Sequence, residues 1–271
     1  MGNTQLLVID PQVDFCDPEG ALFVTGAQED MQRLSEFISR NADKLEAIHC
    51  TLDNHHVMDI AHPLWWQDSD GNPPDPFTII DPDAVESGAW STAQTDARGR
   101  SLNYVKTLGQ NGRYPLCIWP PHCLIGSSGA AVLPELFAAF TDWEASGRKT
   151  VNYIRKGSNP WTEHYSAIQA DVPDPEDPGT LLNASLIHAL EEADQVFIAG
   201  EAGSHCVANT VRDLAENFRD SDSIKKLVLL EDTTSPVPGF ESFQEEFLED
   251  LSARGMQLTL TVDANLSSSA R

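Results

Sequence analysis

The chain has 271 residues, 41% of them hydrophobic, which is enough for one large α/β domain. Acidic residues outnumber basic ones by 42 to 17 and give a formal net charge of −25. Nucleic acid and anionic membranes are therefore not expected partners, because both require a basic patch. Five cysteines without regular spacing, and no signal-like or membrane-length apolar segment, predict a protein of the reducing cytoplasm.

Strand-like apolar runs alternate with helical patterns along the chain. Strands are predicted near 5–9, 47–51, 151–154, 195–199, 226–230 and 257–262, and helices near 28–40, 131–146, 180–192, 205–219 and 241–253. This alternation predicts a three-layer α/β/α fold with a central parallel, doubly wound sheet of six strands. No repeat or linker divides the chain, so we expect a single domain over residues 1–271.

Three of the predicted strands end in residues with catalytic chemistry. The first ends in Asp10, the strand near 151–154 leads to Lys156-Gly157, and the strand near 195–199 leads through a small-residue turn to Cys206. Open α/β sheets place their sites at these carboxyl ends. Taken singly, such residues are more often a cap, a turn and a buried structural thiol. Their occurrence together favours a catalytic set.

The three residue types have complementary roles. A cysteine at a helix N-terminus lies in the positive end of the helix dipole, and a nearby Lys156 ammonium is expected to lower its pKa. Asp10 can carry the thiol proton to a leaving group, and free backbone N–H groups at the turn can bind an oxyanion. His205 precedes Cys206 directly, so the two side chains are not expected to face each other.

A second cluster predicts a metal site. Asp53 and His55 are two residues apart at the end of the second predicted strand, and residues with this spacing point to the same side. His122 follows a rigid Pro-Pro pair. One carboxylate and two imidazoles suit a single Zn²⁺, Fe²⁺ or Mn²⁺ ion. His62 is a possible further ligand. The alternative is that these histidines are simply solvated.

Five segments resemble a known family, the cysteine hydrolases that include isochorismatases and nicotinamidases, and nicotinamidases most closely. They are Val8-Ile-Asp-Pro-Gln-Val-Asp-Phe15, Thr51-Leu-Asp-Asn-His55, Trp119-Pro-Pro-His-Cys123, Lys156-Gly157 with Tyr165-Ser166, and Ala199-Gly-Glu-Ala-Gly-Ser-His-Cys-Val207. The resemblance implies the isochorismatase-like hydrolase fold and a catalytic triad of Asp10, Lys156 and Cys206. It also implies a non-proline cis peptide before Ala202, with the N–H groups of Ala202 and Cys206 as the oxyanion hole.

The resemblance also describes a substrate pocket. Phe15 and Trp119 match aromatic positions that wall the ring pocket of nicotinamidases, and we add Tyr165 and Glu201 as pocket residues. Nicotinamidases usually have an aliphatic residue where this chain has Glu201. In them a metal at the positions of Asp53, His55 and His122 holds the ring nitrogen of the substrate.

A segment of about fifty residues, from 63 to 116, departs from the alternating pattern. It contains Trp65-Trp66, a turn-rich stretch and a helical pattern near 101–108. So long a connection is typical of a lid or a subunit contact. It leaves from the Asp53/His55 end and returns at His122, so we expect it to influence substrate choice.

These features predict an amidohydrolase that uses a Cys206 thioester, nicotinamidase-like, converting nicotinamide to nicotinate and ammonia with a divalent metal in the pocket. Its expected partners are a small carboxamide substrate and other copies of the chain in a homo-oligomer. One alternative is a hydrolase of the same family for a different amide, carbamoyl or ether substrate. Another is a protein that keeps the fold without turnover.

Overall fold

The computed structural model describes residues 2–111 and 113–266. Its central sheet has six parallel strands in the order β10-β9-β8-β1-β2-β7. These strands are β1 (Thr4–Ile9), β2 (Ala47–Asp53), β7 (Asn152–Lys156), β8 (Gln195–Gly200), β9 (Leu227–Leu230) and β10 (Gln257–Thr259). The chain builds outward from β1 through β2 to β7, then returns to β8 on the other side of β1. The strand order thus reverses between β1 and β8, where α/β sheets bind ligands.

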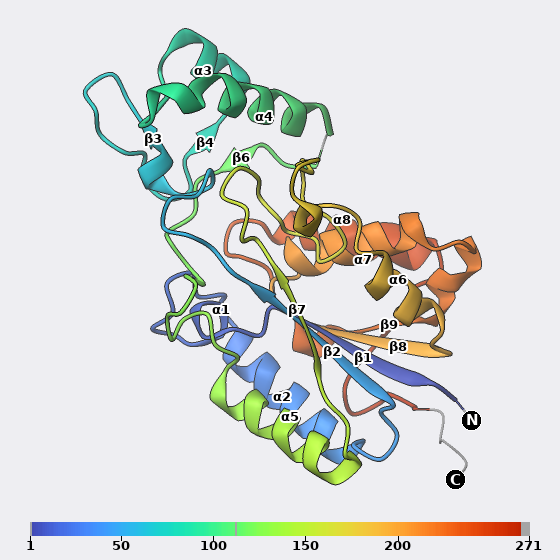
Figure 1. Cartoon of the computed structure of the whole chain (residues 1–271). Helices are drawn as coiled ribbons and strands as arrows, with labels where there is room; N and C mark the ends of the chain where they lie inside the picture. Colours follow the sequence, from blue (N-terminus) through green and yellow to red (C-terminus); the bar gives the residue numbers. More distant parts are fainter. Residues whose placement is uncertain (1, 112, 267–271) are drawn as a thin grey trace.

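Helices cover both faces of the sheet (Figure 1). Helices α2 (Ala27–Arg40) and α5 (Pro134–Gly147) lie on one face, and α6 (Ala184–Glu191), α7 (Cys206–Asn217) and α8 (Glu241–Ala253) on the other. Strand β1 is buried along its whole length and β8 along nearly all of it, as a parallel sheet covered on both faces requires. The fold class predicted from the sequence is therefore confirmed.

Residues 63–116 form a small lobe at the side of the carboxyl ends of the strands (Figure 1). Two antiparallel pairs of short strands build it, β3 (Trp66–Gln67) with β5 (Ser91–Thr92) and β4 (Ile79–Ile80) with β6 (Leu116–Cys117). The lobe also holds α3 (Pro82–Ser87) and α4 (Arg98–Asn111). Both tryptophans of the Trp65-Trp66 pair are buried, and their indole N–H groups donate to the Ser101 hydroxyl and the Ile60 carbonyl.

The remaining helical segments are short. They are α1 (Val13–Cys16) and the 3-10 turns Pro63–Trp65, Thr95–Ala97, Pro178–Thr180, Ser221–Lys226 and Glu231–Thr233. All five cysteines lie in the described part of the chain and are buried with free thiols, as a protein without a disulfide framework requires. Among the described residues, no helix combines the length and apolarity needed to cross a membrane.

Two helix boundaries differ from the prediction for local reasons. Helix α5 begins at Pro134, a residue suited to the first turn because it lacks an N–H, and not at 131. Helix α6 begins at Ala184, because the Asn183 side chain caps it by accepting from the Leu186 N–H, and not at 180.

Candidate active site

The buried Lys156 contacts the other two residues of the predicted catalytic set. Lys156 ends β7, and its Nζ lies 2.9 Å from Asp10 Oδ2 and 3.6 Å from Cys206 Sγ. It also lies 3.2 Å from Asp53 Oδ1. Asp10 follows β1 directly, with a positive φ of 44°, and its Oδ1 accepts a 2.6 Å hydrogen bond from the Thr51 hydroxyl. The strand ends thus bring a carboxylate, an ammonium and a thiol into contact.

The surroundings of Cys206 raise the pKa of its thiol overall, although Lys156 lowers it. Burial raises the pKa of the thiol well above its ordinary value, Lys156 lowers it by less, and Asp10 and Asp53 raise it further. Lys156 is shared among three acidic groups, which raise its own pKa despite burial. Lys156 thus lowers the pKa of the thiol, as predicted, but not enough to hold Cys206 as a thiolate by itself, which the prediction implied. The arrangement suits a thiol that loses its proton to Asp10, whose pKa burial raises, as attack begins.

The turn between β8 and α7 gives two backbone N–H groups beside the thiol. Gly200 has a φ of 115°, and a Cβ there would lie 2.0 Å from the Ile9 carbonyl oxygen, so only glycine fits. The Glu201–Ala202 peptide is cis. Cys206 is the first residue of α7, so its N–H has no partner within the helix. The cis peptide before Ala202 that the resemblance implied is therefore present, while the oxyanion hole itself stays a prediction.

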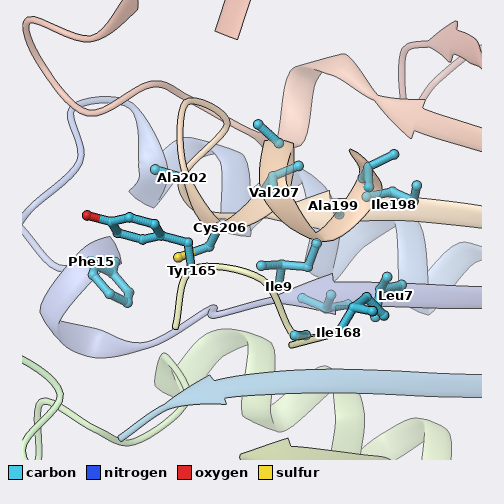
Figure 2. Close-up of a cluster of buried hydrophobic side chains, with 14 of the residues drawn as sticks. Leu7, Ile9, Phe15, Tyr165, Ile168, Ile198, Ala199, Ala202, Cys206 and Val207 are labelled. Carbon is cyan, nitrogen blue, oxygen red and sulfur yellow. The ribbon is translucent and has the colours of Figure 1, made fainter. Parts of the chain in front are cut away.

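A small pocket opens beside Cys206. Phe15, Tyr165, Ala202 and Cys206 gather at one end of the buried cluster shown in Figure 2. Trp119 joins them, and its indole N–H donates to the Tyr165 hydroxyl at 3.0 Å. The full lining is Phe15, Leu22, Asp53, Trp119, His122, Glu163, Tyr165, Ala202, His205, Cys206 and Val237. This aromatic enclosure is suited to a small planar ring.

Glu201 does not line this pocket, contrary to the sequence-based expectation. Its side chain is fully buried, and Oε2 accepts a hydrogen bond from the Ser235 N–H at 3.0 Å. The reason is local. Both faces of the preceding strand are covered, and the carboxyl of Glu201 is directed to Ser235 and Asp30.

The sequence reading missed Glu163, a buried carboxyl in the pocket wall. Its Oε1 accepts from the His164 N–H, and its Oε2 has no partner among the described residues. Burial, together with nearby carboxylates, raises its pKa to about 8. In the sequence, only its position two residues before Tyr165 indicates that Glu163 is near the pocket. His205 also lines the pocket, and burial lowers its pKa to about 3, so it is neutral and forms no ion pair with Cys206.

The predicted metal ligands come together at the pocket edge. Ligand atoms of Asp53, His55 and His122 all lie within 4.8 Å of one another. Asp53 Oδ2 is 3.0 Å from His55 Nε2 and 3.6 Å from His122 Nε2. His62 is adjacent, with its ring 5.1 Å from that of His55 and 5.5 Å from that of His122.

The tautomers of these histidines suit a cation. Nδ1 of His122 lies 2.9 Å from the Pro120 carbonyl and Nδ1 of His62 lies 3.1 Å from the His56 carbonyl, so each must be the protonated nitrogen. Nδ1 of His55 lies 3.0 Å from Asp59 Oδ2. The rings of His122 and His62 can therefore present an Nε2 lone pair, and the Nε2 of His62 is buried without a partner among the described residues. Against the effect of burial, Asp53 and Asp59 raise the pKa of His55, so its Nε2 would become a ligand only when a cation replaces its proton. Such outer acceptors are what orients histidine ligands in metal sites.

Two tyrosines of the lobe form hydrogen bonds with segments that line the site. The Tyr114 hydroxyl donates to the Ser204 carbonyl at 2.9 Å, and its ring stacks on His205. The Tyr104 hydroxyl accepts from the Glu163 N–H at 3.0 Å. Segments far apart in the sequence are thereby fixed to the catalytic turn and to the pocket wall.

Comparisons with known proteins agree with this geometry. No family model matches the chain. The chain is 27% identical over 213 residues to a nicotinamidase/pyrazinamidase of Mycobacterium tuberculosis, covering 78% of each protein. Among solved structures, it matches yeast nicotinamidase Pnc1p bound to the inhibitor nicotinaldehyde with a TM-score of 0.65 and 20% identity, covering 95% of this chain and 99% of the other. It matches the pyrazinamidase of Pyrococcus horikoshii in complex with zinc with a TM-score of 0.57 and 20% identity, over 95% and 99%.

The chain therefore has the isochorismatase-like hydrolase fold. Among proteins of this fold, it most resembles the nicotinamidases, as the sequence segments predicted.

Proposed function

We propose that this protein is a nicotinamidase-like amidohydrolase, which cleaves a ring carboxamide to a carboxylate and ammonia. The observation that carries the proposal is the contact of one buried lysine with Asp10 and Cys206 beside an aromatic pocket. The nicotinamidase relatives support a hydrolase of amide C–N bonds. The close contact of the three catalytic groups counts against a protein that keeps the fold without turnover.

Asp10 takes the proton of the Cys206 thiol as sulfur attacks the carboxamide carbon. The carbonyl oxygen becomes an oxyanion, which the N–H groups of Ala202 and Cys206 stabilise. Asp10 returns the proton to the leaving nitrogen, so that ammonia departs and a thioester remains. Water then attacks the thioester, Asp10 accepts one proton from it, and the Cys206 thiol reforms. Lys156 holds Asp10 in place throughout.

We propose that Asp53, His55 and His122 hold one divalent metal, with His62 adjacent. Their donor set of carboxylate and imidazole fits zinc, iron or manganese. When bound, the metal supplies a Lewis acid that can ligate a ring nitrogen at the pocket edge. Asp53 would serve both sites, because its other oxygen contacts Lys156.

A second candidate is a hydrolase of the same fold for a different amide, carbamoyl or ether substrate. The unpartnered carboxyl of Glu163 in the pocket wall favours it, because such a group can select a ligand with an additional polar substituent. We also propose a cytoplasmic location, a homo-oligomeric state and a lid or subunit-contact role for the lobe.

Ammonia release from a panel of carboxamides, with and without a chelator, tests the proposal. Nicotinamide and pyrazinamide should be hydrolysed faster than benzamide and aliphatic amides, and the chelator should abolish the preference for a ring nitrogen. If no carboxamide is hydrolysed, turnover of a carbamoyl compound or of an ether, followed by chromatography of the products, would favour the second candidate. No turnover of any compound, with metal content established, would contradict both.

A further inference from the structure

A pair of buried carboxyl groups lies behind the oxyanion turn. Glu201 follows β8 and is fully buried, and Asp30 on α2 is 3% exposed. Glu201 Oε2 accepts from the Ser235 N–H, while Oε1 has no partner among the described residues. Burial raises the pKa of Glu201 well above its ordinary value, as do the charge of Asp30 and a hydrogen bond between the two side chains.

Two neighbouring buried carboxyls and the unpartnered Oε1 of Glu201 indicate one proton on this pair, which we place on Glu201. Asp30 Oδ1 accepts from the Arg33 guanidinium at 2.5 Å, and its Oδ2 accepts from the Ser235 hydroxyl at 2.6 Å. Asp30 therefore has the partners of a carboxylate. Glu201 contacts no cation directly, and a buried charge without a partner is costly. A neutral Glu201 would donate its proton to Asp30 and remove the unpartnered oxygen.

Ser235 connects this pair to the reaction centre. Its N–H donates to the side chain of Glu201, and its carbonyl accepts from the Gly203 N–H at 2.8 Å. These two bonds hold the residues on either side of Ala202. The Glu201 N–H donates to the Ile9 carbonyl at 2.8 Å, so the turn is also tied to β1. The direction of the Ala202 N–H thus depends on the carboxyl of Glu201.

We propose that Glu201 is a positioning residue for the oxyanion hole: as a neutral acid it links Asp30 to Ser235 and fixes the Ala202 N–H. The expected effect on kcat rests on the proposed function. The charged and titratable groups that face Glu201 are Asp30 and Arg33 from α2 and Cys16 from α1. Loss of the Glu201 proton at alkaline pH would place two carboxylates side by side. The nearby cation, Arg33, is 41% exposed, so water screens it and it compensates the second charge poorly. The turn would then shift and kcat would fall.

Two variants of Glu201 test the proposal, with Glu29→Gln in the first turn of α2 as the control. Glu201→Gln can donate to Asp30 and accept from Ser235 but cannot ionise. We expect its kcat to stay near that of the wild type at neutral pH, with the alkaline fall in kcat moved or removed. Glu201→Leu keeps the volume but neither bond. We expect kcat to fall about 10- to 100-fold with little change in KM, as for a misdirected oxyanion donor.

Infrared spectroscopy separates this inference from the proposed function. The difference spectrum between wild type and Glu201→Gln should contain the C=O stretch of a protonated acid, even if no carboxamide is hydrolysed. An absent band, an unchanged alkaline profile in Glu201→Gln, or wild-type kcat in Glu201→Leu would each overturn the proposal. If Glu201→Leu fails to fold, the glutamine variant and the spectrum decide.

Discussion

At the scale of single residues, the position of Lys156 explains most of the electrostatics of the site. An ammonium buried among Asp10, Asp53 and Cys206 compensates the cost of burying these acids, and each of them compensates the cost of burying the lysine. Lys156 also connects the thiol to the metal ligands through Asp53. The proposed nucleophile and the proposed metal ligands are therefore linked through one lysine, and a change in either should affect the other.

Replacing Cys206 by Ala should abolish amide hydrolysis and leave the fold intact. Loss of a covalent nucleophile costs about 10³-fold or more in kcat. Cys50→Ala is a control, because Cys50 is also buried but lies within β2 and does not line the pocket. Ammonia release and circular dichroism provide the two readouts. If Cys206→Ala keeps a substantial part of the wild-type kcat, the thioester mechanism is wrong.

Metal content should depend on both the proposed ligands and Asp59. The His55→Ala/His122→Ala double variant should purify without metal, because only one proposed ligand remains. Asp59→Asn should weaken metal binding about 10- to 100-fold, because its single amide oxygen cannot accept from both the His55 ring and the Ala61 N–H.

Elemental analysis and competition with a chelator measure these two effects. His56→Ala is the control, since His56 is an exposed histidine in the same loop. Full metal occupancy in the double variant would contradict the proposed ligand set.

At the scale of elements, the long strands were predictable and the lobe was not. An apolar run such as Leu6–Ile9 specifies a buried strand by itself, whereas the strands of the lobe have two residues each and depend on their partners. The same distinction applies to the site. Asp10 and Cys206 lie at the ends of predictable elements. His62 and Glu163 lie in loops, where only tertiary contacts such as the Tyr104 hydroxyl bond determine their place.

The lobe carries exposed apolar side chains that suit a subunit contact. Leu64, Phe77 and Ile79 are 48%, 50% and 45% exposed, and Phe77 also packs edge-to-face on Trp119 of the pocket. A Phe77→Ser/Ile79→Ser variant should therefore lower the oligomeric mass measured by light scattering and raise KM. Val262→Ser is the control, because Val262 is 74% exposed and lies outside the lobe. An unchanged mass would show that the lobe is not the subunit contact.

At the scale of the whole molecule, buried histidines and buried carboxyls change the free energy of unfolding with pH in opposite directions. Burial lowers the pKa of His49 and His62 to about 4 and that of His164 and His205 to about 3. Burial raises the pKa of Glu163 to about 8 and that of Asp171 to about 7. The histidines destabilise the fold as pH falls from their unfolded pKa towards their folded pKa. The two carboxyls destabilise it as pH rises from their unfolded pKa up to their folded pKa, above which the effect is constant.

His49 lies outside the proposed active site, so its contribution to the loss of stability at acid pH can be measured separately. It lies in β2 with Nε2 3.0 Å from Gln5 Oε1 and Nδ1 3.0 Å from Asn152 Nδ2, so the neutral ring has both bonds satisfied. Its folded pKa of about 4 lies below the unfolded value of about 6.5. As pH falls, the unfolded chain therefore binds the proton before the folded protein does. For each pH unit of acidification between these two values, His49 should lower the free energy of unfolding by about 1.4 kcal/mol.

His49→Gln should retain both hydrogen bonds without a titratable ring. Urea unfolding between pH 4 and 8 should then show a shallower fall in the free energy of unfolding below about pH 6.5 than in wild type. His188→Gln is the control, because His188 is an exposed residue on α6. If the two variants lose stability with the same slope on acidification, His49 is not neutral in the fold, and the acid sensitivity of the protein arises elsewhere.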